Sequence, residues 1–401
     1  MKRQDKKLVY VAMSGGVDSS VASALLKKRG FDVVGVFMKP WSPDLSTVLP
    51  ITTPGVVNKV FVDKCMWKED REDAMRAASV LGIPFKTWDF SKQYKKLVTD
   101  YMVREYKAGR TPNPDVMCNK EIKFGLFFNR AIKEGADFIA TGHYVRIKRK
   151  SQTTNHKSQI NPKLKNKFEN LNIENSLEIV NCKLKIAKDK NKDQSYFLWT
   201  LTQKQLKYCL FPIGDYIKPE IRKMAKKFGL PNHDKKDSQG VCFIGPLDMK
   251  DFLKTKIKPK KGKIISLRLN LKEIIGEHDG ACYYTIGQRH GLNLSIGGGP
   301  YYVVSKDVKK NIIYVGDEKD LYSKILKISD ISWINPTWKL NFQVKKAMGV
   351  DVRVRYRAGL KKAILKKNGE LWLKTPERAI TSGQSAVFYR NGELLGGGII
   401  R

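Results

Sequence analysis

A short segment rich in glycine and serine, Ser14–Ser19, most constrains how this chain can fold. Before it, Leu8–Met13 is continuously apolar, as expected of a buried parallel strand. After it, Val21–Gly30 has the apolar residues, the basic last turn and the final glycine of a helix. The two glycines let several N–H groups point inward at the positive end of the helix dipole, and Ser14 and Ser19 add hydroxyl donors. The segment therefore predicts a loop that holds phosphates.

The loop differs from a Walker loop, because no Gly-Lys-Ser/Thr follows at the required spacing. An ordinary strand–helix turn is the simpler alternative, and it would need only the two glycines. The order Ser-Gly-Gly-Val-Asp-Ser-Ser instead resembles the PP-loop of ATP pyrophosphatases, which cleave ATP between the α- and β-phosphates and transfer AMP.

Further strands and helices alternate after this loop. Asp32–Met38 and Ala136–His143 have the pattern of buried strands, and Glu69–Gly82 has the pattern of a helix. This alternation predicts an α/β fold with a doubly wound parallel sheet, whose ligands bind beyond the carboxyl ends of the strands. Met38 and Gly142 lie at two such ends, and we expect both beside the nucleotide.

The composition changes along the chain and suggests three domains. We expect a PP-loop domain over residues 1–212, a small central domain over 213–298 and a C-terminal β-barrel over 299–401. Segments 42–63 and 148–182 interrupt the first domain as insertions. The second is rich in Asn, Lys, Ser and Gln with little apolar periodicity, so we expect it to be solvated, with Cys182 exposed in it.

The last part of the chain alternates apolar and polar residues between Gly/Asn turns, after a helical stretch at Lys218–Gly229. Tyr301–Val304, Val352–Arg357 and Ser385–Tyr389 are examples of the strands that suggest a small barrel. On the second of these strands, arginines 353, 355 and 357 would share one face and could contact phosphates, although a solvated barrel edge explains them about as well.

The charge of the chain points to a polyanionic partner. Lysine and arginine total 76 against 39 acidic residues, a formal charge of +37, and nucleic acid is the commonest partner for such a field. Lysine enrichment from a biased genome would also raise the charge. Because no uncharged apolar run of 18 residues occurs and Met1–Lys7 is too short and polar for a signal peptide, we expect a cytoplasmic protein that spans no membrane.

Six cysteines are scattered through the chain with no Cys-x-x-Cys pair, so a zinc ribbon is not expected. Two have unusual neighbours. Cys118 follows Asp115 by three residues in a proline-rich loop, where a thiol and a carboxylate could act as nucleophile and acid/base. Cys242 lies between glycines in a short segment. Taken separately, each would be explained as well by a buried structural cysteine.

Taken together, the phosphate loop and the two cysteines suggest sulfur transfer to an activated carbonyl, and the chain closely resembles the bacterial tRNA-specific 2-thiouridylases. The matching segments are Ala12–Ser19, Phe37–Lys39, Asn113–Asp115, Cys118–Asn119, Ala140–Tyr144, Lys192–Phe197, Asp237–Gly245, Tyr284–Arg289, Ser382–Gln384 and Gly396–Ile400. They run through almost the whole chain in one order. The two insertions depart from the family pattern but leave every motif intact.

The resemblance implies an ATP-dependent reaction on the wobble uridine of tRNA. The residues implied to hold ATP are Ala12, Met13, Ser14, Gly15, Gly16, Val17, Asp18, Ser19, Met38 and Gly142. Mg²⁺ would come with ATP, and no tightly bound metal with protein ligands is expected. The uridine 2-carbonyl oxygen would take AMP and release pyrophosphate, which makes the oxygen a good leaving group.

The resemblance also implies roles for both cysteines. Cys242 would carry the sulfur as a persulfide and Cys118 would be the nucleophile that attacks it, leaving a transient Cys118–Cys242 disulfide. Either free hydrosulfide or the persulfide itself would attack the activated carbon, and the sequence does not separate these routes.

The implied tRNA contacts lie in three segments. Asn113, Pro114 and Asp115 would contact the target base, with Asp115 as the candidate acid/base, and Lys192, Asp193, Gln194, Arg355 and Tyr356 would contact the rest of the tRNA. The implied partners of this monomer are the tRNAs for Lys, Glu and Gln and a sulfur donor, either a cysteine desulfurase or a sulfur-relay protein. The alternative functions are a PP-loop ligase that adenylates a small carbonyl compound and a non-catalytic tRNA-binding protein.

Overall fold

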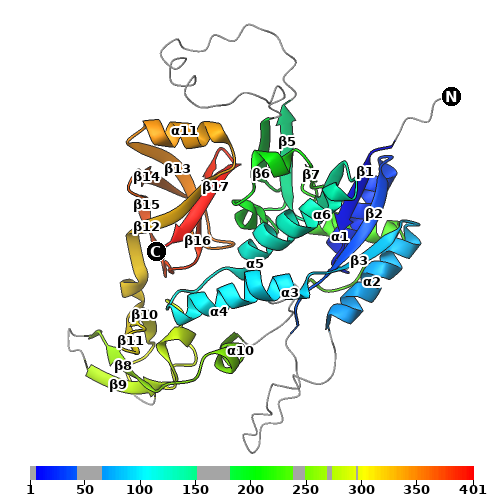
Figure 1. Cartoon of the computed structure of the whole chain (residues 1–401). Coiled ribbons are helices and arrows are strands. Elements are labelled where there is room, and N and C mark those ends of the chain that lie inside the picture. The colour runs from blue at the N-terminus through cyan, green and yellow to red at the C-terminus, as the bar shows by residue number, and fades with distance from the viewer. Residues whose placement is uncertain (1–5, 43–65, 151–180, 238–248, 269–272, 295–296) are drawn as a thin grey trace, which may run out of the picture.

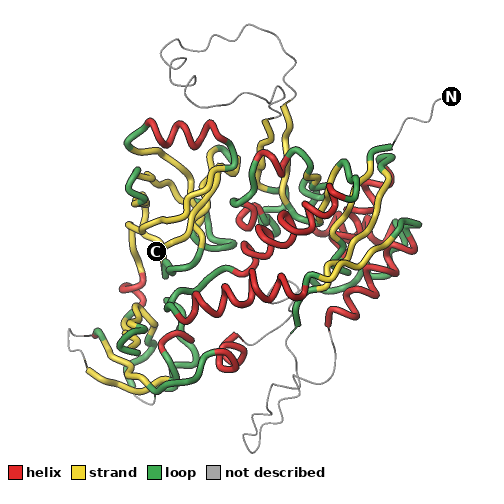
Figure 2. The backbone as a smooth tube through the Cα atoms, viewed as in Figure 1, coloured by secondary structure: helices red, strands yellow, loops and turns green. Residues whose placement is uncertain are grey.

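The computed structural model describes residues 6–42, 66–150, 181–237, 249–268, 273–294 and 297–401 (Figure 1). The insertion at 42–63 falls almost wholly outside these ranges, as does Cys242. Helices, strands and loops alternate through the first half of the chain, and strands dominate the last third (Figure 2). No described helix is long and apolar enough to cross a membrane.

A five-stranded parallel sheet forms the first domain, as the sequence predicts. Its order is β3-β2-β1-β4-β7, with β1 at Leu8–Ala12, β2 at Asp32–Lys39, β3 at Phe85–Asp89, β4 at Phe138–Thr141 and β7 at Cys209–Leu210. Helices α1 (Val17–Lys28), α2 (Met66–Val80) and α9 (Lys218–Lys227) share one core with the sheet. The opposite face packs on the helices that follow β3. Helices on both faces confirm the doubly wound fold.

The segment between β3 and β4 is almost wholly helical and forms two rods. The first consists of α3 (Ser91–Tyr94), the π-helix η2 (Lys95–Thr99) and α4 (Asp100–Lys107). The second consists of α5 (Pro114–Met117), the π-helix η3 (Cys118–Phe127) and α6 (Phe128–Lys133). In Figure 1, α4 lies beneath α5 and faces the central domain, where its buried Met102 and Tyr106 join Phe252 and Leu253 of α10 (Met249–Lys256).

The central domain is a four-stranded sheet in the order β10-β11-β8-β9. These strands are β8 (Gly262–Ser266), β9 (Glu273–His278), β10 (Tyr302–Asp307) and β11 (Ile312–Gly316). The short helices around them and in the first domain are η4 (Ser195–Leu198), α8 (Gln203–Leu206), η6 (Ala281–Tyr283) and η7 (Glu318–Leu321).

The C-terminal domain is a closed six-stranded barrel, since β12 pairs with both β15 and β17. Its elements are β12 (Tyr322–Trp333), α11 (Pro336–Val344), β13 (Ala347–Arg353), β14 (Lys361–Lys366), β15 (Glu370–Arg378), β16 (Ser385–Arg390) and β17 (Glu393–Ile400). Large apolar side chains of all six strands fill it.

Packing places the domain boundaries later than the expected positions of 212 and 298. Helix α9 packs on α1, so the first domain continues past residue 212. Strand β10, which was expected in the barrel, pairs with β11 in the central sheet. A periodic pattern gives the type of an element but not the neighbour on which it packs, and this is why both boundaries were misplaced.

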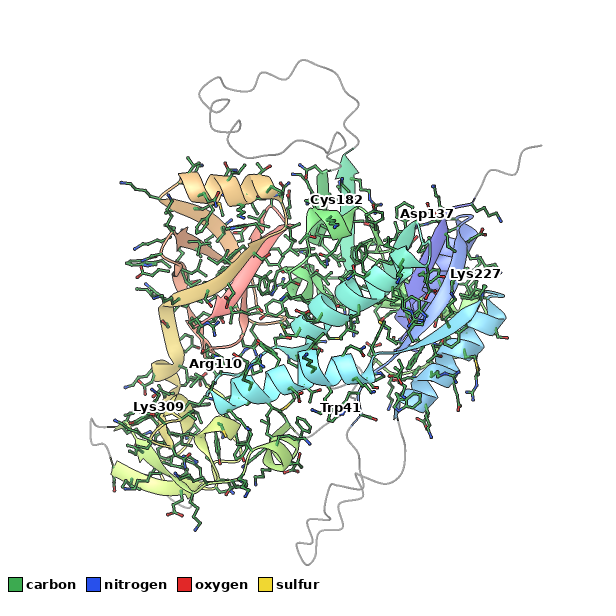
Figure 3. The ribbon with its side chains drawn as sticks, viewed as in Figure 1. Trp41, Arg110, Asp137, Cys182, Lys227 and Lys309 are labelled. Atoms are coloured by element: carbon green, nitrogen blue, oxygen red, sulfur yellow. The ribbon has the colours of Figure 1, made fainter. Side chains whose placement is uncertain are left out.

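The expected insertion 148–182 is structured at both of its ends. Strand β5 (Val145–Lys150) pairs with β6 (Asn181–Ile186), and β6 in turn pairs with β17 of the barrel. Cys182 is therefore buried on β6, at 1% exposure, and not exposed as expected (Figure 3). Its neighbours Leu184 and Cys209 belong to the same core.

The expected arginine face on Val352–Arg357 is wrong, because β13 ends at Arg353 and the chain then turns. Arg357 has a positive φ of 65°, outside any strand conformation. Arg353 points into the protein, where its guanidinium donates to the fully buried Asp193 carboxylate at 2.8 Å. Asp193 also accepts hydrogen bonds from Ala187 N and Ser195 Oγ. This ion pair joins the barrel to the first domain.

Removal of Arg353 should destabilise the protein strongly, because it leaves the Asp193 carboxylate buried without its cation. Arg353→Met is expected to lower the free energy of unfolding by about 3–5 kcal/mol, and Asp193→Asn in the same chain should recover part of it. Urea denaturation followed by circular dichroism measures both. Lys362→Met, which removes an exposed ion pair with Asp351, is the control and should cost less than about 1 kcal/mol. Equal losses for the two single variants would contradict the importance of the buried pair.

Candidate active site at the phosphate loop and the Cys118 helix

The expected phosphate loop connects β1 to α1. Gly15 has a φ of +77°, and a Cβ atom there would lie 2.1 Å from the Asp70 carbonyl oxygen, so glycine is required. Gly16 is the N-cap of α1 and supplies no side-chain cap. The first-turn N–H groups of a twelve-residue helix thus face the loop at the positive end of its dipole. This arrangement suits an anionic group.

The two loop serines first stabilise the loop itself. Ser19 Oγ donates to the Gly16 carbonyl at 3.1 Å and accepts from the Ser14 backbone N–H at 3.2 Å. The Ser14 and Ser19 hydroxyl oxygens are 3.4 Å apart. Ser14 is half-buried.

Gly142 and Met38 lie at the carboxyl ends of β4 and β2, as the sequence predicts. These two strands flank β1 in the sheet. A Cβ atom on Gly142 would be 2.7 Å from the Ser19 backbone nitrogen, so the end of β4 lies directly against the first turn of α1. Met38 is 2% exposed at the end of β2 and packs in the core. Gly142 therefore closes one side of the loop, whereas Met38 belongs to the core on the face of the sheet opposite α1.

Asp18, in the first turn of α1, is held by two groups that sequence reasoning did not assign to the site. Tyr144 OH donates to Asp18 Oδ1 at 2.8 Å, and Lys218 Nζ donates to both carboxylate oxygens at 2.8 and 2.9 Å. Burial, together with the Asp18 charge, raises the pKa of Tyr144 and keeps its phenol protonated. Lys218 comes from α9, 200 residues later in the chain, and only its place in a basic helical pattern marked it in the sequence.

Asn232 is a further unpredicted residue at this loop. It is 4% exposed, and its Nδ2 donates to the Gly15 carbonyl at 2.8 Å and to Ser20 Oγ at 3.0 Å. These bonds hold the loop in the conformation that Gly15 permits. His143, in contrast, is fully buried beside Phe124 and Phe211 and bonds to Thr141 at 2.8 Å. Its burial lowers its pKa, as for a structural histidine.

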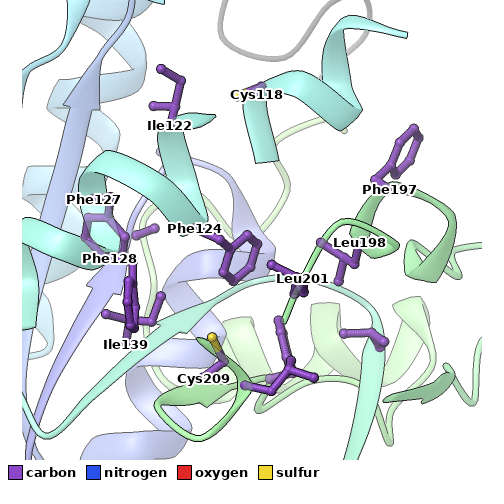
Figure 4. Close-up of a cluster of buried hydrophobic side chains, with 14 of the residues drawn as sticks. Cys118, Ile122, Phe124, Phe127, Phe128, Ile139, Phe197, Leu198, Leu201 and Cys209 are labelled. Atoms are coloured by element: carbon purple, nitrogen blue, oxygen red, sulfur yellow. The ribbon is translucent and has the colours of Figure 1, made fainter. Parts of the chain in front are cut away.

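Cys118 begins the π-helical part of the second rod. Asn113 Oδ1 caps this rod by accepting from the backbone N–H groups of Asp115 and Val116 at 3.1 and 3.2 Å, and Pro114 occupies the first turn. Cys118 is 0% exposed among apolar side chains (Figure 4), whereas Asp115 is half-buried one turn earlier. π-Helical segments occur frequently at functional sites, which is consistent with a reactive role for this turn.

Asn119 adds an unusual polar group next to Cys118. Its Nδ2 donates to the Asp115 carbonyl at 2.9 Å, and its buried Oδ1 has no hydrogen-bond partner in the part of the chain that the structure describes. A buried acceptor of this kind is costly unless a ligand or water satisfies it.

The loop before Cys118 is held by all three domains. Gln384 of the barrel donates from Nε2 to the Thr111 carbonyl at 2.9 Å, and the Thr111 N–H donates to the Ser382 carbonyl at 2.8 Å. Gly383 is required there because a Cβ atom would meet the Thr111 backbone at 2.8 Å. Thr285 of the central domain bonds to the Thr111 hydroxyl at 3.3 Å. Three of the motifs that resemble those of the family thus meet at one loop.

A cavity of about 310 Å³ lies between α4, the second rod and the barrel. It is lined by Tyr101, Glu105, Asn113, Val116, Met117, Lys120, Trp199, Thr200, Asp330, Ser332, Gly383, Ser385, Ile399 and Arg401. Of the expected base-contacting residues, it includes Asn113. Asp115 and Cys118 are not in the lining, and residues 113, 116, 117 and 120 follow the spacing of one helical face.

The expected tRNA contacts divide into accessible and buried groups. Lys192 is part-exposed and pairs with Asp237, and Arg355 is exposed, donating to the Ala379 carbonyl at 3.0 Å. Tyr356 is half-buried, with its ring 4.4 Å from that of Phe197. Gln194 accepts from the Tyr144 N–H at 2.9 Å. The expected contact between Asp193 and tRNA is wrong for its side chain, because the carboxylate is fully buried against Arg353.

Three family models match consecutive parts of this chain. They are described as a tRNA methyl transferase HUP domain, matching residues 7–246, a tRNA methyl transferase PRC-barrel domain, matching 250–317, and an aminomethyltransferase β-barrel domain, matching 323–400. Their limits agree with the boundaries that the packing gives.

Curated relatives are similar over the full length. The chain is 41% identical over 424 residues to the tRNA-specific 2-thiouridylase MnmA of Karelsulcia muelleri, with 98% of this chain and 99% of that protein covered. It is 39% identical to the protein of the same name from Flavobacterium johnsoniae (98% and 100% covered) and 40% identical to that from Bacillus licheniformis (100% and 96% covered).

Substitution of Gly142 tests the geometry of the phosphate loop. Gly142→Ala should weaken binding of a fluorescent ATP analogue by about tenfold or more, because the new methyl group displaces the first turn of α1. Equilibrium fluorescence titration measures the affinity. Gly349→Ala on the barrel, where an added Cβ meets nothing within 4 Å, is the matched control and should bind like the unaltered protein. Unchanged affinity in Gly142→Ala would exclude this loop as the ATP site.

Proposed function

Because the chain belongs to the tRNA-specific 2-thiouridylase family, whose members are tRNA sulfurtransferases, we propose that it replaces the 2-oxygen of the tRNA wobble uridine with sulfur in an ATP-dependent reaction. The observation that carries the ATP-dependent part is the α1 N-terminus, which has no side-chain cap and is closed by Gly142. The charge of +37 favours a tRNA substrate.

ATP would bind with its phosphates at the Ala12–Ser19 loop, where backbone N–H groups and the helix dipole stabilise their charge. Mg²⁺ is commonly held by one or two carboxylates together with substrate phosphates, so a metal that arrives on ATP would need few protein ligands at this loop. Within the described ranges, no cluster of three His, Cys, Asp or Glu side chains could hold a resident ion.

In the first step, the 2-carbonyl oxygen of uridine would attack the α-phosphate, forming a C–O–AMP bond and releasing pyrophosphate. Asp115 would be the acid/base, and its half-buried position in the capped first turn that leads to Cys118 supports this role. Asn113 would orient the base from the same turn. Because Asn113 lines the cavity, a neighbouring nucleotide would have room there.

In the second step, the sulfur would come from a persulfide on Cys242, supplied by a sulfur-donor protein. Attack of the Cys118 thiolate on the Cys242 sulfur would release hydrosulfide, which adds to C2 and expels AMP; alternatively, the terminal persulfide sulfur would add first. Both routes end in a Cys118–Cys242 disulfide that a thiol reductant must reduce before the next turnover. Lys192, Gln194, Arg355 and Tyr356 would position the tRNA, with those for Lys, Glu and Gln as the proposed substrates.

Mass spectrometry of tRNA nucleosides tests this function. Unmodified tRNA incubated with the protein, ATP, Mg²⁺ and a cysteine desulfurase that carries persulfide sulfur from L-cysteine should gain 2-thiouridine only when ATP is present. Cys118→Ser and Cys242→Ser should each abolish thiolation while pyrophosphate release persists, and Cys282→Ala in the central domain should retain both. A methylated nucleoside in place of a thiolated one would overturn the proposal, as would full thiolation by either serine variant.

The loop held by three domains yields a second expectation. Gln384→Leu removes the donor to the Thr111 and Pro112 carbonyls and should loosen the turn that carries Asp115. We expect the rate of thiolation to fall about tenfold while the affinity for the ATP analogue changes less than about twofold, since the phosphate loop is untouched. A parallel loss of ATP affinity would mean that the variant disturbs the whole fold.

A further inference from the structure

Lys218 lies between two carboxylates that belong to different functional segments. Its side chain is only 11% exposed, and its Nζ donates to Asp18 at 2.8 and 2.9 Å and pairs with Asp237 at 2.7 Å. Asp18 is in the phosphate loop, and Asp237 precedes Cys242 by five residues along the chain. One buried ammonium group therefore connects the loop to the segment that leads to the second cysteine.

The backbone of Lys218 is held firmly, so its ammonium group has a defined position. Lys218 N donates to Asp189 Oδ2 at 3.0 Å, and Ile217 N donates to Glu220 at 2.8 Å in the first turn of α9. Ile221, on the next turn, is 0% exposed in the core shared with α1. The helix that carries Lys218 is thus packed directly on the helix that carries Asp18.

Asp237 also pairs with Lys192, one of the expected tRNA-contacting residues. Its carboxylate pairs with Lys192 and, at 3.5 Å, with Arg222 as well as with Lys218. Burial alone would raise the pKa of Asp237, but the hydrogen bonds from Lys192 and Lys218 lower it to about 2. The carboxylate is therefore ionised at any working pH, and Lys218 is the cation that it shares with Asp18.

We propose that Lys218 is a positioning residue that holds Asp18 of the phosphate loop and Asp237 in one arrangement, and that both ATP binding and sulfur transfer depend on this link. The part that concerns sulfur rests on the function proposed above. The part that concerns the loop does not, because it requires only that ATP binds at Ser14–Ser19. Without the ammonium group, Asp18 would keep the Tyr144 hydroxyl as its hydrogen-bond donor among the described side chains, and the two carboxylates would lose their shared cation.

Three variants and a control separate this role from a general effect on stability. Lys218→Met removes the charge, Lys218→Arg keeps a cation that can bond to two carboxylates, and Asp237→Asn cuts only the far side of the bridge. Lys188→Met is the matched control, because Lys188 is an exposed lysine that pairs with Glu220 on the same helix. For each protein, we would measure the affinity for a fluorescent ATP analogue, tRNA-dependent pyrophosphate release, 2-thiouridine formation and the melting temperature.

Lys218→Met should weaken binding of the ATP analogue about tenfold and lower thiolation further, whereas Lys218→Arg should recover affinity to within about threefold. Asp237→Asn should bind the analogue within about twofold but thiolate at least about fivefold more slowly, since Lys218 still holds Asp18. Lys188→Met should match the unaltered protein. A merely structural role would instead lower the melting temperature and all activities together.

The proposal is overturned if Lys218→Met binds the analogue as tightly as Lys188→Met, if Lys218→Arg is as defective as Lys218→Met, or if Asp237→Asn thiolates normally. If Lys218→Met does not fold, Lys218→Arg and Asp237→Asn still decide between these outcomes. If the unaltered protein binds the analogue but forms no 2-thiouridine, the proposed function is refuted but the role of Lys218 at the phosphate loop is not. The affinities of the Lys218 variants for the analogue would then test that role.

Discussion

The need to compensate buried charge organises this structure. Arg353 at the end of a barrel strand reaches the buried Asp193 carboxylate, and this pair holds the barrel against the first domain. On the same domain, Gln384 donates a hydrogen bond to the Thr111 carbonyl, and Gly383 lies directly against the Thr111 backbone. The ion pair and the contacts at Thr111 therefore both join the barrel to the first domain.

A second set of buried charges organises the phosphate loop. The glycines and the uncapped α1 helix create the anion site, but Lys218, Tyr144 and Asn232 from later in the chain hold it in shape. The Arg353–Asp193 pair and the Lys218 cluster are linked along the chain, because Asp193 belongs to the first and its neighbour Lys192 pairs with Asp237 of the second. A segment expected to contact tRNA therefore also supports the architecture.

Most elements and the parallel sheet could be predicted from the sequence, because continuous apolar runs and helical periodicity reflect burial directly. The same patterns failed where packing partners mattered. Val352–Arg357 alternates like a strand, yet β13 ends at Arg353, whose side chain pairs with Asp193, and Arg357 has a positive φ. Lys148–Cys182 is polar overall, yet its ends pair as β5 and β6 against the barrel.

By itself, the sequence determined the chemistry that is local in the chain: the Gly/Ser loop between a strand and a helix, and the spacing of Asp115 and Cys118 in one proline-rich segment, which the structure shows as a capped helical turn and not as an irregular loop. Short-range steric and hydrogen-bonding preferences suffice for such features. Only the tertiary structure decided which charges meet. Lys218 reaches Asp18 across 200 residues, Gln384 reaches Thr111 across 273, and Asp193 turns inward to Arg353 across 160. Pairing over such separations depends on how the domains pack, and no local pattern records it.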